Sequence, residues 1–504
     1  MIAAFAIGVH WSSFFAAGPD ASGYVSQSAM WLRGELTWQA PAWVNDATWN
    51  DAAASAAPVG YRPGPATQTI VPTYPPGFPL LMSGFQLIGG PDAAFYVVPV
   101  CGAVAVWGAY ILGAFFAGGA AGLAACVLLL SSPAFLIMLV QAMSDVPAAA
   151  LWILALVAAR GASAPRAAAA GLATCAAILV RPNLAPLSLV PLALVVVHTS
   201  SGRQRIVRAL AFVGAISPAV IALAALNRHL HGSALRSGYG EMVNLYDMHR
   251  VVPNLASYGA ALIGTQTPLV LLAAGAPFLV SGQRRREALL ITVVFPLLVL
   301  ALYLPYERFT VWWFLRFLLP AYPALAAGTA AALVLLLSRI PRAHVRGAAL
   351  TLVVIGVAVH GVLRARSEGV FGIRDADRRY QAAVEYARGL PPQSVLVSLL
   401  HSGTLHYYTG RDVLRWDTVD GPSLERAVGH IADRGYEVYL FLDPGERDAF
   451  NERFAGTAVA AQVTPERAVH LRGDVLVYRL LSASRHERVA VHSGAGRPNQ
   501  IHAM

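Results

Sequence analysis

The sequence predicts an α-helical polytopic membrane protein, with about 11 transmembrane helices and a small α/β soluble domain at its C-terminus. Hydrophobic residues make up 56% and charged residues only 13% of the 504 residues, whereas about a quarter of a soluble domain is charged. Many apolar runs approach the roughly 20 residues that cross a bilayer as a helix. Because lipid offers no hydrogen-bond partners to the backbone, such runs must be helical. After about residue 374 the apolar runs give way to alternating strand and helix patterns.

The apolar runs define the expected spans, and several are short enough to need tilt or local thinning of the bilayer. The first run lacks a basic leading region and a clear cleavage site, so we interpret it as a retained span. The predicted spans are 1–18, 92–117, 119–138, 146–160, 166–181, 184–199, 208–226, 258–280, 287–304, 313–337 and 346–364.

Basic residues in the short loops predict the orientation. The net charge is +10 and the chain has no Lys, so the basic side chains apart from His are Arg. With the predicted spans, four Arg groups fall on one side, which the positive-inside rule makes cytoplasmic. They are Arg160 and Arg166; Arg203, Arg205 and Arg208; Arg284, Arg285 and Arg286; and Arg339, Arg342 and Arg346. Because the Arg residues lie in short loops between apolar runs, the positive charge is explained by membrane orientation and indicates no nucleic-acid partner. We expect an inner (plasma) membrane protein with a cytoplasmic N-terminus and an extracytoplasmic C-terminal domain.

The stretch Tyr74-Pro75-Pro76-Gly77-Phe78-Pro79 and the apolar residues after it resemble a further span. Counting it as one would place the Arg groups on alternating sides. We therefore interpret it as a helix packed at the outer surface, entered through prolines that suit a helix start.

The predicted domains are a transmembrane domain at 1–370 with a first outer loop at 19–91, an extracytoplasmic α/β domain at 371–482, and a disordered tail at 483–504. In the α/β domain we expect helices over Asp375–Gly389 and Glu425–Gly435, and strands over Ser394–Leu399 and Glu437–Leu442. No Gly-rich phosphate loop follows either strand, so nucleotide binding is not supported. The three cysteines lie in apolar segments and form no CxxC motif, so neither a disulfide framework nor a metal knuckle is indicated.

Two acidic residues stand at the predicted outer ends of spans, Asp20 after the first and Asp145 at the start of the fourth. A carboxylate at a membrane boundary is costly unless it faces a polar cavity or a partner. Both are candidate catalytic residues. The alternatives are a solvated loop acid for Asp20 and a helix N-cap for Asp145.

Three arginines also reach the outer face: Arg181 at a break between two spans, and Arg308 and Arg316, which flank Trp312 and Trp313. Guanidinium groups suit phosphate recognition because they present paired donors. The alternative is snorkelling beside an aromatic belt.

The outer loop 227–257 is rich in His, acids and Tyr, including Tyr239, but its spacing matches no metal-ligand pattern. A solvated or substrate-lining loop is the simpler interpretation, and no metal site or certain cofactor is predicted. The first outer segment is rich in Trp. Tryptophan is common at membrane interfaces and also stacks on sugars, and the sequence leaves both roles open. The Trp residues of that segment are Trp31, Trp38, Trp43 and Trp49.

A set of motifs resembles the C-type (GT-C) superfamily of membrane glycosyltransferases, in the branch of protein O-mannosyltransferases and lipid A aminoarabinose transferases (glycosyltransferase family 39). In order, the motifs are Asp20 with Tyr24 behind it, the Tyr74 entry, Ser144-Asp145-Val146-Pro147, Arg181-Pro182, and Arg316-Phe317-Leu318-Leu319-Pro320-Ala321-Tyr322-Pro323. The segments Ser237-Gly238-Tyr239-Gly240 and His401-Ser402-Gly403-Thr404-Leu405-His406-Tyr407-Tyr408-Thr409-Gly410-Arg411 also resemble bacterial members.

The resemblance implies transfer of a sugar from a polyprenyl phosphate carrier to a lipid, glycan or protein acceptor on the outer face, with inversion. Asp20 matches the first-loop catalytic acid of the family and Asp145 the acid of the second outer loop. The substrate-binding residues implied are Tyr24, Tyr74, Arg181, Tyr239, Arg308 and Arg316. Ala21 stands where many members carry a second acid, which weakens any divalent metal site there. A transporter or lipid flippase and a non-catalytic envelope assembly protein are the competing interpretations.

Overall fold

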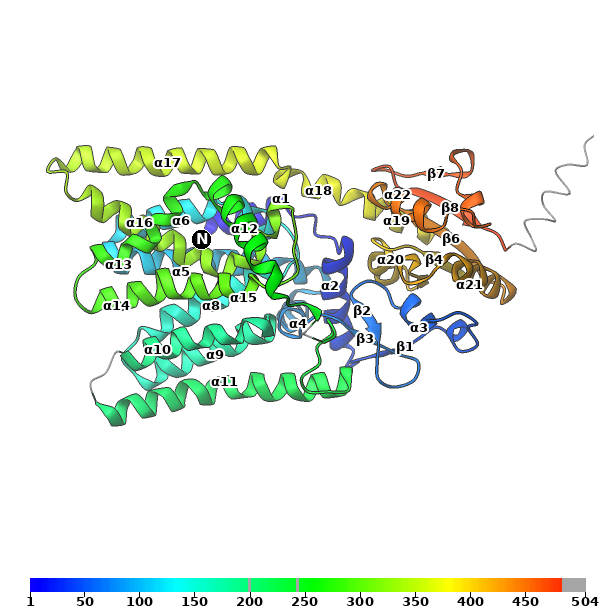
Figure 1. Ribbon diagram of the computed structural model, residues 1–504, viewed down its shortest axis with the longest axis horizontal. Coiled ribbons are helices and arrows are strands. Elements are labelled where there is room, and N and C mark those ends of the chain that lie inside the picture. Colours follow the sequence, from blue (N-terminus) through cyan, green and yellow to red (C-terminus); the bar gives the residue numbers. More distant parts are fainter. Residues whose placement is uncertain (198–200, 242–243, 483–504) are drawn as a thin grey trace, which may run out of the picture. The chain divides into compact units, whose positions relative to one another are not determined.

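The computed structural model describes residues 1–197, 201–241 and 244–482, so the predicted tail lies outside the described residues (Figure 1). The chain divides into two compact units. The bundle unit comprises Met1–Phe14, Gln27–Gly34 and Tyr74–Arg374. The sheet unit comprises Phe15–Ser26, Glu35–Thr73 and the chain from Asp375 onward. The first predicted outer loop is thus divided between the two units.

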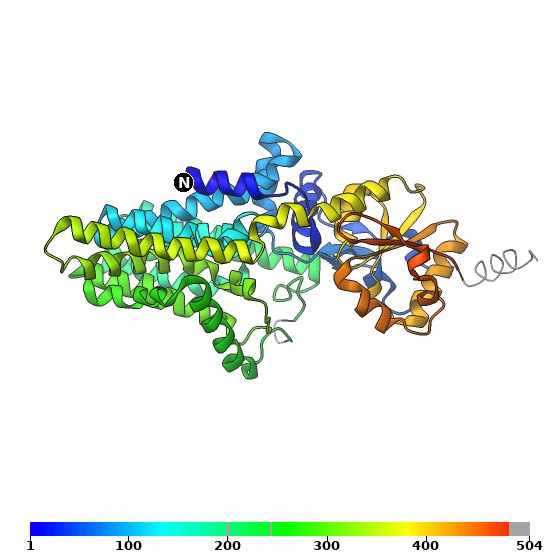
Figure 2. The same cartoon turned by 90° about the horizontal axis from the view of Figure 1, so that it is seen from above.

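The bundle unit is built of apolar helices that run side by side (Figure 1 and Figure 2). Within it α5 packs against α6, α8 and α16, and α9 packs against α8 and α11. Its α-helices are α1 (Ile2–Trp11), α4 (Gly77–Gly89), α5 (Val97–Ala117), α6 (Gly119–Leu130), α7 (Pro133–Leu139), α8 (Asp145–Ala159), α9 (Ala164–Val180), α10 (Leu189–Val197), α11 (Gly202–His231), α12 (Val251–Gln266), α13 (Ala276–Leu279), α14 (Gln283–Leu289), α15 (Phe295–Tyr303), α16 (Tyr322–Leu337) and α17 (Ala343–Ser367), and the short α18 (Ile373–Ala376) follows. The helix α2 (Gly18–Leu32) begins in the sheet unit and ends in the bundle unit.

Glycine allows two of these helices to approach closely. A Cβ atom built on Gly171 of α9 would lie 2.4 Å from the carbonyl oxygen of Phe212 in α11. Any larger residue would force the two helices apart, as expected where small residues line a contact between membrane helices.

Five helices of the described residues are long and apolar enough to cross a membrane, and two bent helix pairs would raise the number to seven. The protein is therefore membrane-embedded, but a count of 11 spans is not confirmed. The helix expected in the apolar stretch that follows Tyr74 is present as α4, which spans Gly77–Gly89.

Two predicted continuous spans, 119–138 and 258–280, are instead broken helices. The first bends by 67° between α6 and α7 and the second by 100° between α12 and the 3-10 helix η6 (Pro268–Gly275). At the second break Thr267 has a φ of +61° immediately before Pro268. A proline lacks the N–H that would continue the helix, and it excludes the α conformation from the residue before it.

The predicted first span is shorter than expected. The helix α1 ends at Trp11, Ser12 is extended, and α2 begins at Gly18, which has a φ of +74°. A left-handed residue at a helix start favours glycine, because glycine alone adopts that conformation without cost. Residues 12–17 therefore form a connection, where the apolar composition predicted helix.

The sheet unit contains two sheets. The first is three-stranded and antiparallel in the order β1-β3-β2, and the second is five-stranded in the order β5-β4-β6-β8-β7, with β4 parallel to β5 and β6. Its strands are β1 (Trp38–Gln39), β2 (Tyr61–Pro63), β3 (Thr69–Pro72), β4 (Ser394–Val397), β5 (Asp412–Leu414), β6 (Glu437–Leu442), β7 (Val469–His470) and β8 (Leu476–Leu480). Its further helices are α3 (Ala52–Ser55), α19 (Arg378–Arg388), α20 (Ser402–Thr409), α21 (Gly421–Asp433) and α22 (Arg447–Arg453).

The predicted strands at 394–399 and 437–442 and both predicted helices of this region are present. The antiparallel strands β7 and β8 and the three strands of the first outer loop were not expected. These strands are short, and most have neither a long alternating pattern nor a continuous apolar run.

Side chains alternate between the two faces of the larger sheet, and each face has its own apolar core. Val395 and Val397 lie in one core and Leu396 in the other. Trp43 and Trp49, from the first outer loop, are buried in the core with Val395. Trp43 and Trp49 are only 1% and 5% exposed. Neither residue therefore lies at a membrane interface or stacks on a sugar, the two roles left open for the tryptophans.

Candidate functional site

In the bundle unit the structure brings Asp145 and Arg181 together. Asp145 is the first residue of α8, and Arg181 follows the end of α9, where Pro182 ends the helix. The Arg181 Nη2 atom lies 2.6 Å from Asp145 Oδ1, and the carboxylate is fully buried. Arg181 Nε also donates to Ser144 Oγ at 3.3 Å. The N-cap position of α8 is Ser144, which makes no side-chain capping bond. Asp145 is the first residue of the helix and not its N-cap, and its carboxylate forms an ion pair with Arg181.

Two further residues, Tyr303 and Asn183, which were not predicted as site residues, lie beside Arg181. Arg181 Nη1 donates to the Tyr303 hydroxyl at 3.3 Å, and Asn183 Nδ2 donates to the same oxygen at 2.9 Å. Tyr303 ends α15 and is buried. The only sequence signal for it is a tyrosine at the end of an apolar run. Its contact with Arg181 spans 122 positions in the sequence.

Arg181 and Arg316 lie over the same aromatic ring. The guanidinium carbon of Arg316, in the 3-10 helix η8 (Trp312–Ala321), is 5.3 Å from the centre of the Phe317 ring, and that of Arg181 is 5.8 Å from it. Tyr303 stacks on Phe317 with ring centres 5.0 Å apart. An arginine beside an aromatic face keeps its planar donor edges available while the ring attracts its charge. We call Asp145, Arg181, Tyr303, Arg316 and Phe317 the bundle cluster.

The other predicted substrate-binding residues of the bundle unit lie in different surroundings. Arg308 is exposed, on the stretch between α15 and η8. Tyr74 is buried, and its ring centre lies 6.2 Å from that of the half-exposed Tyr239. The loop after α11 thus contacts the chain just before α4.

Asp20 and Tyr24 lie in the sheet unit, on α2. Asp20 occupies the first turn and is half-buried, and Tyr24 lies one turn later and is buried. The two predicted catalytic acids, Asp20 and Asp145, therefore belong to different units.

A second buried polar cluster, which the sequence analysis missed, lies in the sheet unit. His401 Nε2 is 3.3 Å from Asp443 Oδ2, and Arg379 Nε is 3.1 Å from the same oxygen. Burial lowers the pKa of His401, while the hydrogen bond to Asp443 acts in the opposite direction. Glu446 accepts hydrogen bonds from the backbone N–H groups of Asp443 and Leu400, and burial raises its pKa to about 7.

Among the residues that the structure describes, no group of three or more His, Cys, Asp or Glu side chains could hold a metal ion. This holds also for the His and acidic residues of the loop after α11, all of which the structure describes.

Comparison with solved structures gives the fold. ArnT from Cupriavidus metallidurans bound to undecaprenyl phosphate is similar, with a TM-score of 0.54 and 13% sequence identity over 96% of this chain and 97% of that one. An oligosaccharyltransferase from Archaeoglobus fulgidus tethered to an acceptor peptide is also similar. Its TM-score is 0.57 and its identity 12%, over 96% of this chain and 74% of that chain. Both are C-type glycosyltransferases.

The chain has the C-type glycosyltransferase fold. The resemblance read from the ordered sequence motifs is thereby confirmed at the level of the fold. No family model matches the sequence, and no curated protein matches it. At identities of 12–13%, the likeness assigns no activity, and the activity rests on the chemistry of the residues described above.

Proposed function

We propose that this chain is an integral-membrane glycosyltransferase that moves a sugar from a polyprenyl phosphate carrier to an acceptor on the outer face of the membrane. The observation that carries the proposal is the bundle cluster, where two guanidinium groups lie over one ring in a chain with the C-type glycosyltransferase fold. A phosphate-linked donor needs cations at its leaving group, and arginine presents paired donors for that purpose.

Within the bundle cluster the two arginines have different surroundings. Arg181 uses one edge of its guanidinium on the carboxylate of Asp145. We assign the carrier phosphate first to Arg316, because its element η8 also lines the apolar cavity described below, with Arg181 beside it and Asp145 holding Arg181 in place. As the bond from the sugar to the phosphate breaks, negative charge grows on the leaving oxygen. Cations already in place there stabilise the transition state more than the ground state.

The bundle unit also has a cavity suited to a hydrocarbon chain. A cavity of about 230 Å³ is lined almost entirely by apolar side chains, among them Tyr258, Leu318 and Tyr322. Leu318 belongs to η8, the element that carries Arg316. An apolar cavity lined in part by the element that carries Arg316 suits a lipid phosphate, whose chain is apolar and whose headgroup is anionic.

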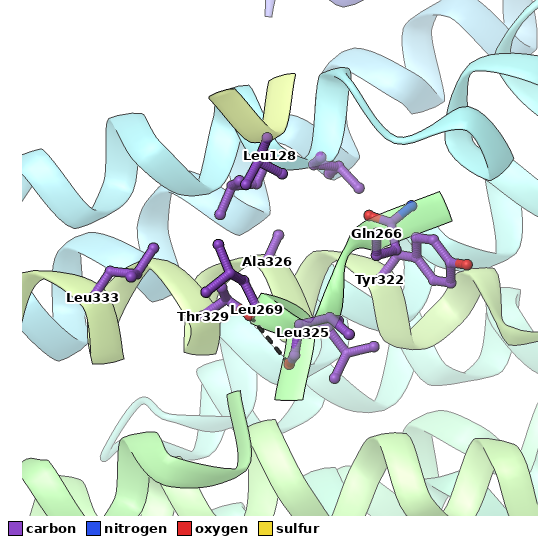
Figure 3. A pocket seen from close by; sticks show the side chains of 11 residues that line it. Leu128, Gln266, Leu269, Tyr322, Leu325, Ala326, Thr329 and Leu333 are labelled. Atoms are coloured by element: carbon purple, nitrogen blue, oxygen red, sulfur yellow. Dashed lines mark hydrogen bonds between the residues drawn. The ribbon is translucent and has the colours of Figure 1, made fainter. Parts of the chain in front are cut away.

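Tyr322 also lines a second, smaller cavity with Leu128 and Gln266 (Figure 3). Its volume of about 30 Å³ is close to that of one water molecule. It is therefore too small for a ligand, and of these two cavities the larger one offers a place for the carrier chain.

In the proposed reaction an acceptor hydroxyl attacks the anomeric carbon of the sugar. Asp20 accepts the hydroxyl proton as general base, the bond from the anomeric carbon to the phosphate oxygen breaks, and polyprenyl phosphate leaves. Attack opposite the leaving group inverts the anomeric configuration. Asp20 is half-buried in the first turn of α2, so an acceptor can reach it.

Vesicles containing the purified protein test the proposal. They receive a panel of polyprenyl-phosphate sugars, each labelled in the sugar, together with membrane extract as acceptor. We expect release of free polyprenyl phosphate and label on the acceptor, without ATP or an ion gradient, and loss of both in Arg316→Ala vesicles. Label that enters the vesicle lumen still attached to its carrier would indicate a flippase and contradict the proposal.

A further inference from the structure

The connection between α1 and α2 has a polar backbone that needs partners. Residues 12–17 are not helical, and they end just before the first turn of α2, which carries Asp20. Ala16, four positions before Asp20, is fully buried. A buried backbone N–H or C=O without a hydrogen bond costs free energy comparable to a lost hydrogen bond. Both polar groups of Ala16 therefore depend on whatever packs over them.

The helix α20 supplies both partners. The Ala16 N–H donates to the hydroxyl oxygen of Tyr408 at 2.9 Å, and Thr404 Oγ1 donates to the Ala16 carbonyl at 2.8 Å. Thr404 is fully buried. The rings of Phe15 and Tyr408 stack with centres 4.2 Å apart and planes 8° apart. The N–H and the carbonyl of Ala16 are thus both hydrogen-bonded to residues about 390 positions away in the sequence. The stacked rings of Phe15 and Tyr408 add a further contact between the same two segments.

The same helix also lies against the first turns of α2. A Cβ atom on Gly403 would lie 2.4 Å from Ser22 Oγ and 2.8 Å from the carbonyl oxygen of Val59. Ser402 Oγ accepts from the Val59 N–H at 3.1 Å. Glycine at 403 therefore permits a close approach, and α20 contacts the chain on both sides of Asp20.

We propose that α20 is a positioning helix, whose Thr404 and Tyr408 set the location of the Asp20 carboxylate by holding the backbone at Ala16. The inference rests on the proposed function of Asp20 as general base. It assigns the C-terminal domain a part in the geometry of the transfer step, through two residues that act on the backbone at Ala16. Displacement of a catalytic group by about 1 Å lowers the rate by on the order of 10²-fold. The hydrogen bonds at Ala16, four residues before Asp20, are therefore expected to affect turnover.

Thr404→Val is the primary test, because valine keeps the shape and loses the hydroxyl that donates to Ala16. We expect kcat to fall by about 10–100-fold with little change in the KM of donor or acceptor. Thr404→Ser keeps the donor and should restore kcat. Thr409→Val, on the same helix, is the matched control, since Thr409 Oγ1 bonds the carbonyl of Leu405 and the N–H of Arg411. A kcat loss as large in the control would contradict the inference.

Hydrogen exchange of the peptide at 12–22 gives a readout that needs no activity. Thr404→Val and Tyr408→Phe should both raise exchange at this peptide, whereas Thr409→Val should not. Tyr408→Phe keeps the ring stack on Phe15 and removes only the oxygen that accepts from Ala16. Raised exchange with unchanged kcat would overturn the positioning role.

Combination with Asp20→Asn separates this inference from the proposed function. If Thr404 acts through Asp20, Thr404→Val costs little in a background that already lacks the Asp20 carboxylate. An equal loss in both backgrounds, with Asp20→Asn itself strongly impaired, would overturn the inference alone. Normal transfer by Asp20→Asn would overturn the proposed function of Asp20 and the inference with it.

Discussion

Asp145 and Arg181 form a buried ion pair, with 2.6 Å between Asp145 Oδ1 and Arg181 Nη2. The pair joins the start of α8 to the end of α9. Desolvation of two charges is costly, and the loss of one partner leaves the other charge buried without compensation. The pair therefore connects the stability of the bundle unit with the position of an arginine beside the proposed phosphate site.

Asp145→Asn is expected to destabilise the protein by about 3–5 kcal/mol, because it removes the carboxylate that compensates the charge of Arg181 in a buried site. Urea unfolding of the detergent-solubilised protein measures the change. The double variant Asp145→Asn with Arg181→Gln should recover part of the loss, since it removes the uncompensated charge. A variant with wild-type stability and reduced turnover would instead favour Asp145 as a proton acceptor.

Asp20→Asn keeps the size of the side chain and removes the proposed base. Turnover should fall by about 10²–10⁴-fold, the usual contribution of a general base. Asp92→Asn is the matched control, since Asp92 is an exposed acid in the first turn of the 3-10 helix η2 (Pro91–Tyr96). Initial rates of transfer in vesicles are compared for the three proteins. Near-normal transfer by Asp20→Asn would end its assignment as the base.

Arg316→Lys retains the charge and loses the planar pair of donors. Donor binding or turnover should weaken by about 1–3 kcal/mol, while acceptor affinity should change little, because the acceptor attacks from the side opposite the phosphate. Steady-state kinetics with donor and acceptor varied separately measure both effects, and Arg339→Lys, in an exposed loop, controls for the substitution itself. Unchanged donor kinetics would make Arg316 a membrane anchor, since lysine snorkels as well as arginine does.

The predicted orientation places Arg285 in the cytoplasm and the C-terminal domain outside. Asp433 is exposed at the end of α21, and single-cysteine variants Asp433→Cys and Arg285→Cys report the two sides. A membrane-impermeant maleimide added to intact cells should label position 433 and reach position 285 only after lysis. The reverse pattern would exclude transfer on the outer face.

The pKa of His401 predicts a pH dependence of stability in the sheet unit. Burial lowers this pKa below the ordinary histidine value of about 6.5, so below that pH the unfolded chain binds a proton that the folded domain does not. The contribution of His401 is therefore complete above pH 6.5 and is lost as the pH falls. Glu446, with its pKa raised to about 7, contributes in the opposite direction, since its stabilising proton is lost as the pH rises toward 7.

A difference measurement reports on His401 together with its hydrogen-bond partner Asp443, whose pKa the histidine lowers, because the titrating groups away from this pair are common to both proteins. The unfolding free energy of wild type minus that of His401→Gln should decrease between pH 7.5 and pH 5, as measured by pulse proteolysis of the full chain in urea. Parallel curves for the two proteins would show that His401 titrates alike in the folded and unfolded states.

Much of the architecture follows from local pattern. The apolar runs predict helices wherever lipid denies the backbone other partners, and the periodicity after residue 374 predicts α19, α21, β4 and β6. The break in the first helix at Trp11 and the 100° bend after Gln266 were not predicted. Both fall inside apolar stretches whose composition matches a span, so hydropathy alone does not reveal them.

The sequence by itself determined that the chain is membrane-embedded, which residue types stand at the ends of its helices, and the ordered motifs of the C-type glycosyltransferase fold. Only the tertiary structure decided that Arg181 pairs with Asp145 and contacts Tyr303, and that Thr404 and Tyr408 hold Ala16. Hydropathy and periodicity are local properties, set by each residue and its neighbours within a few turns. These contacts join positions from 36 to 392 apart, and such partners are chosen by the packing of whole elements, which no local pattern encodes.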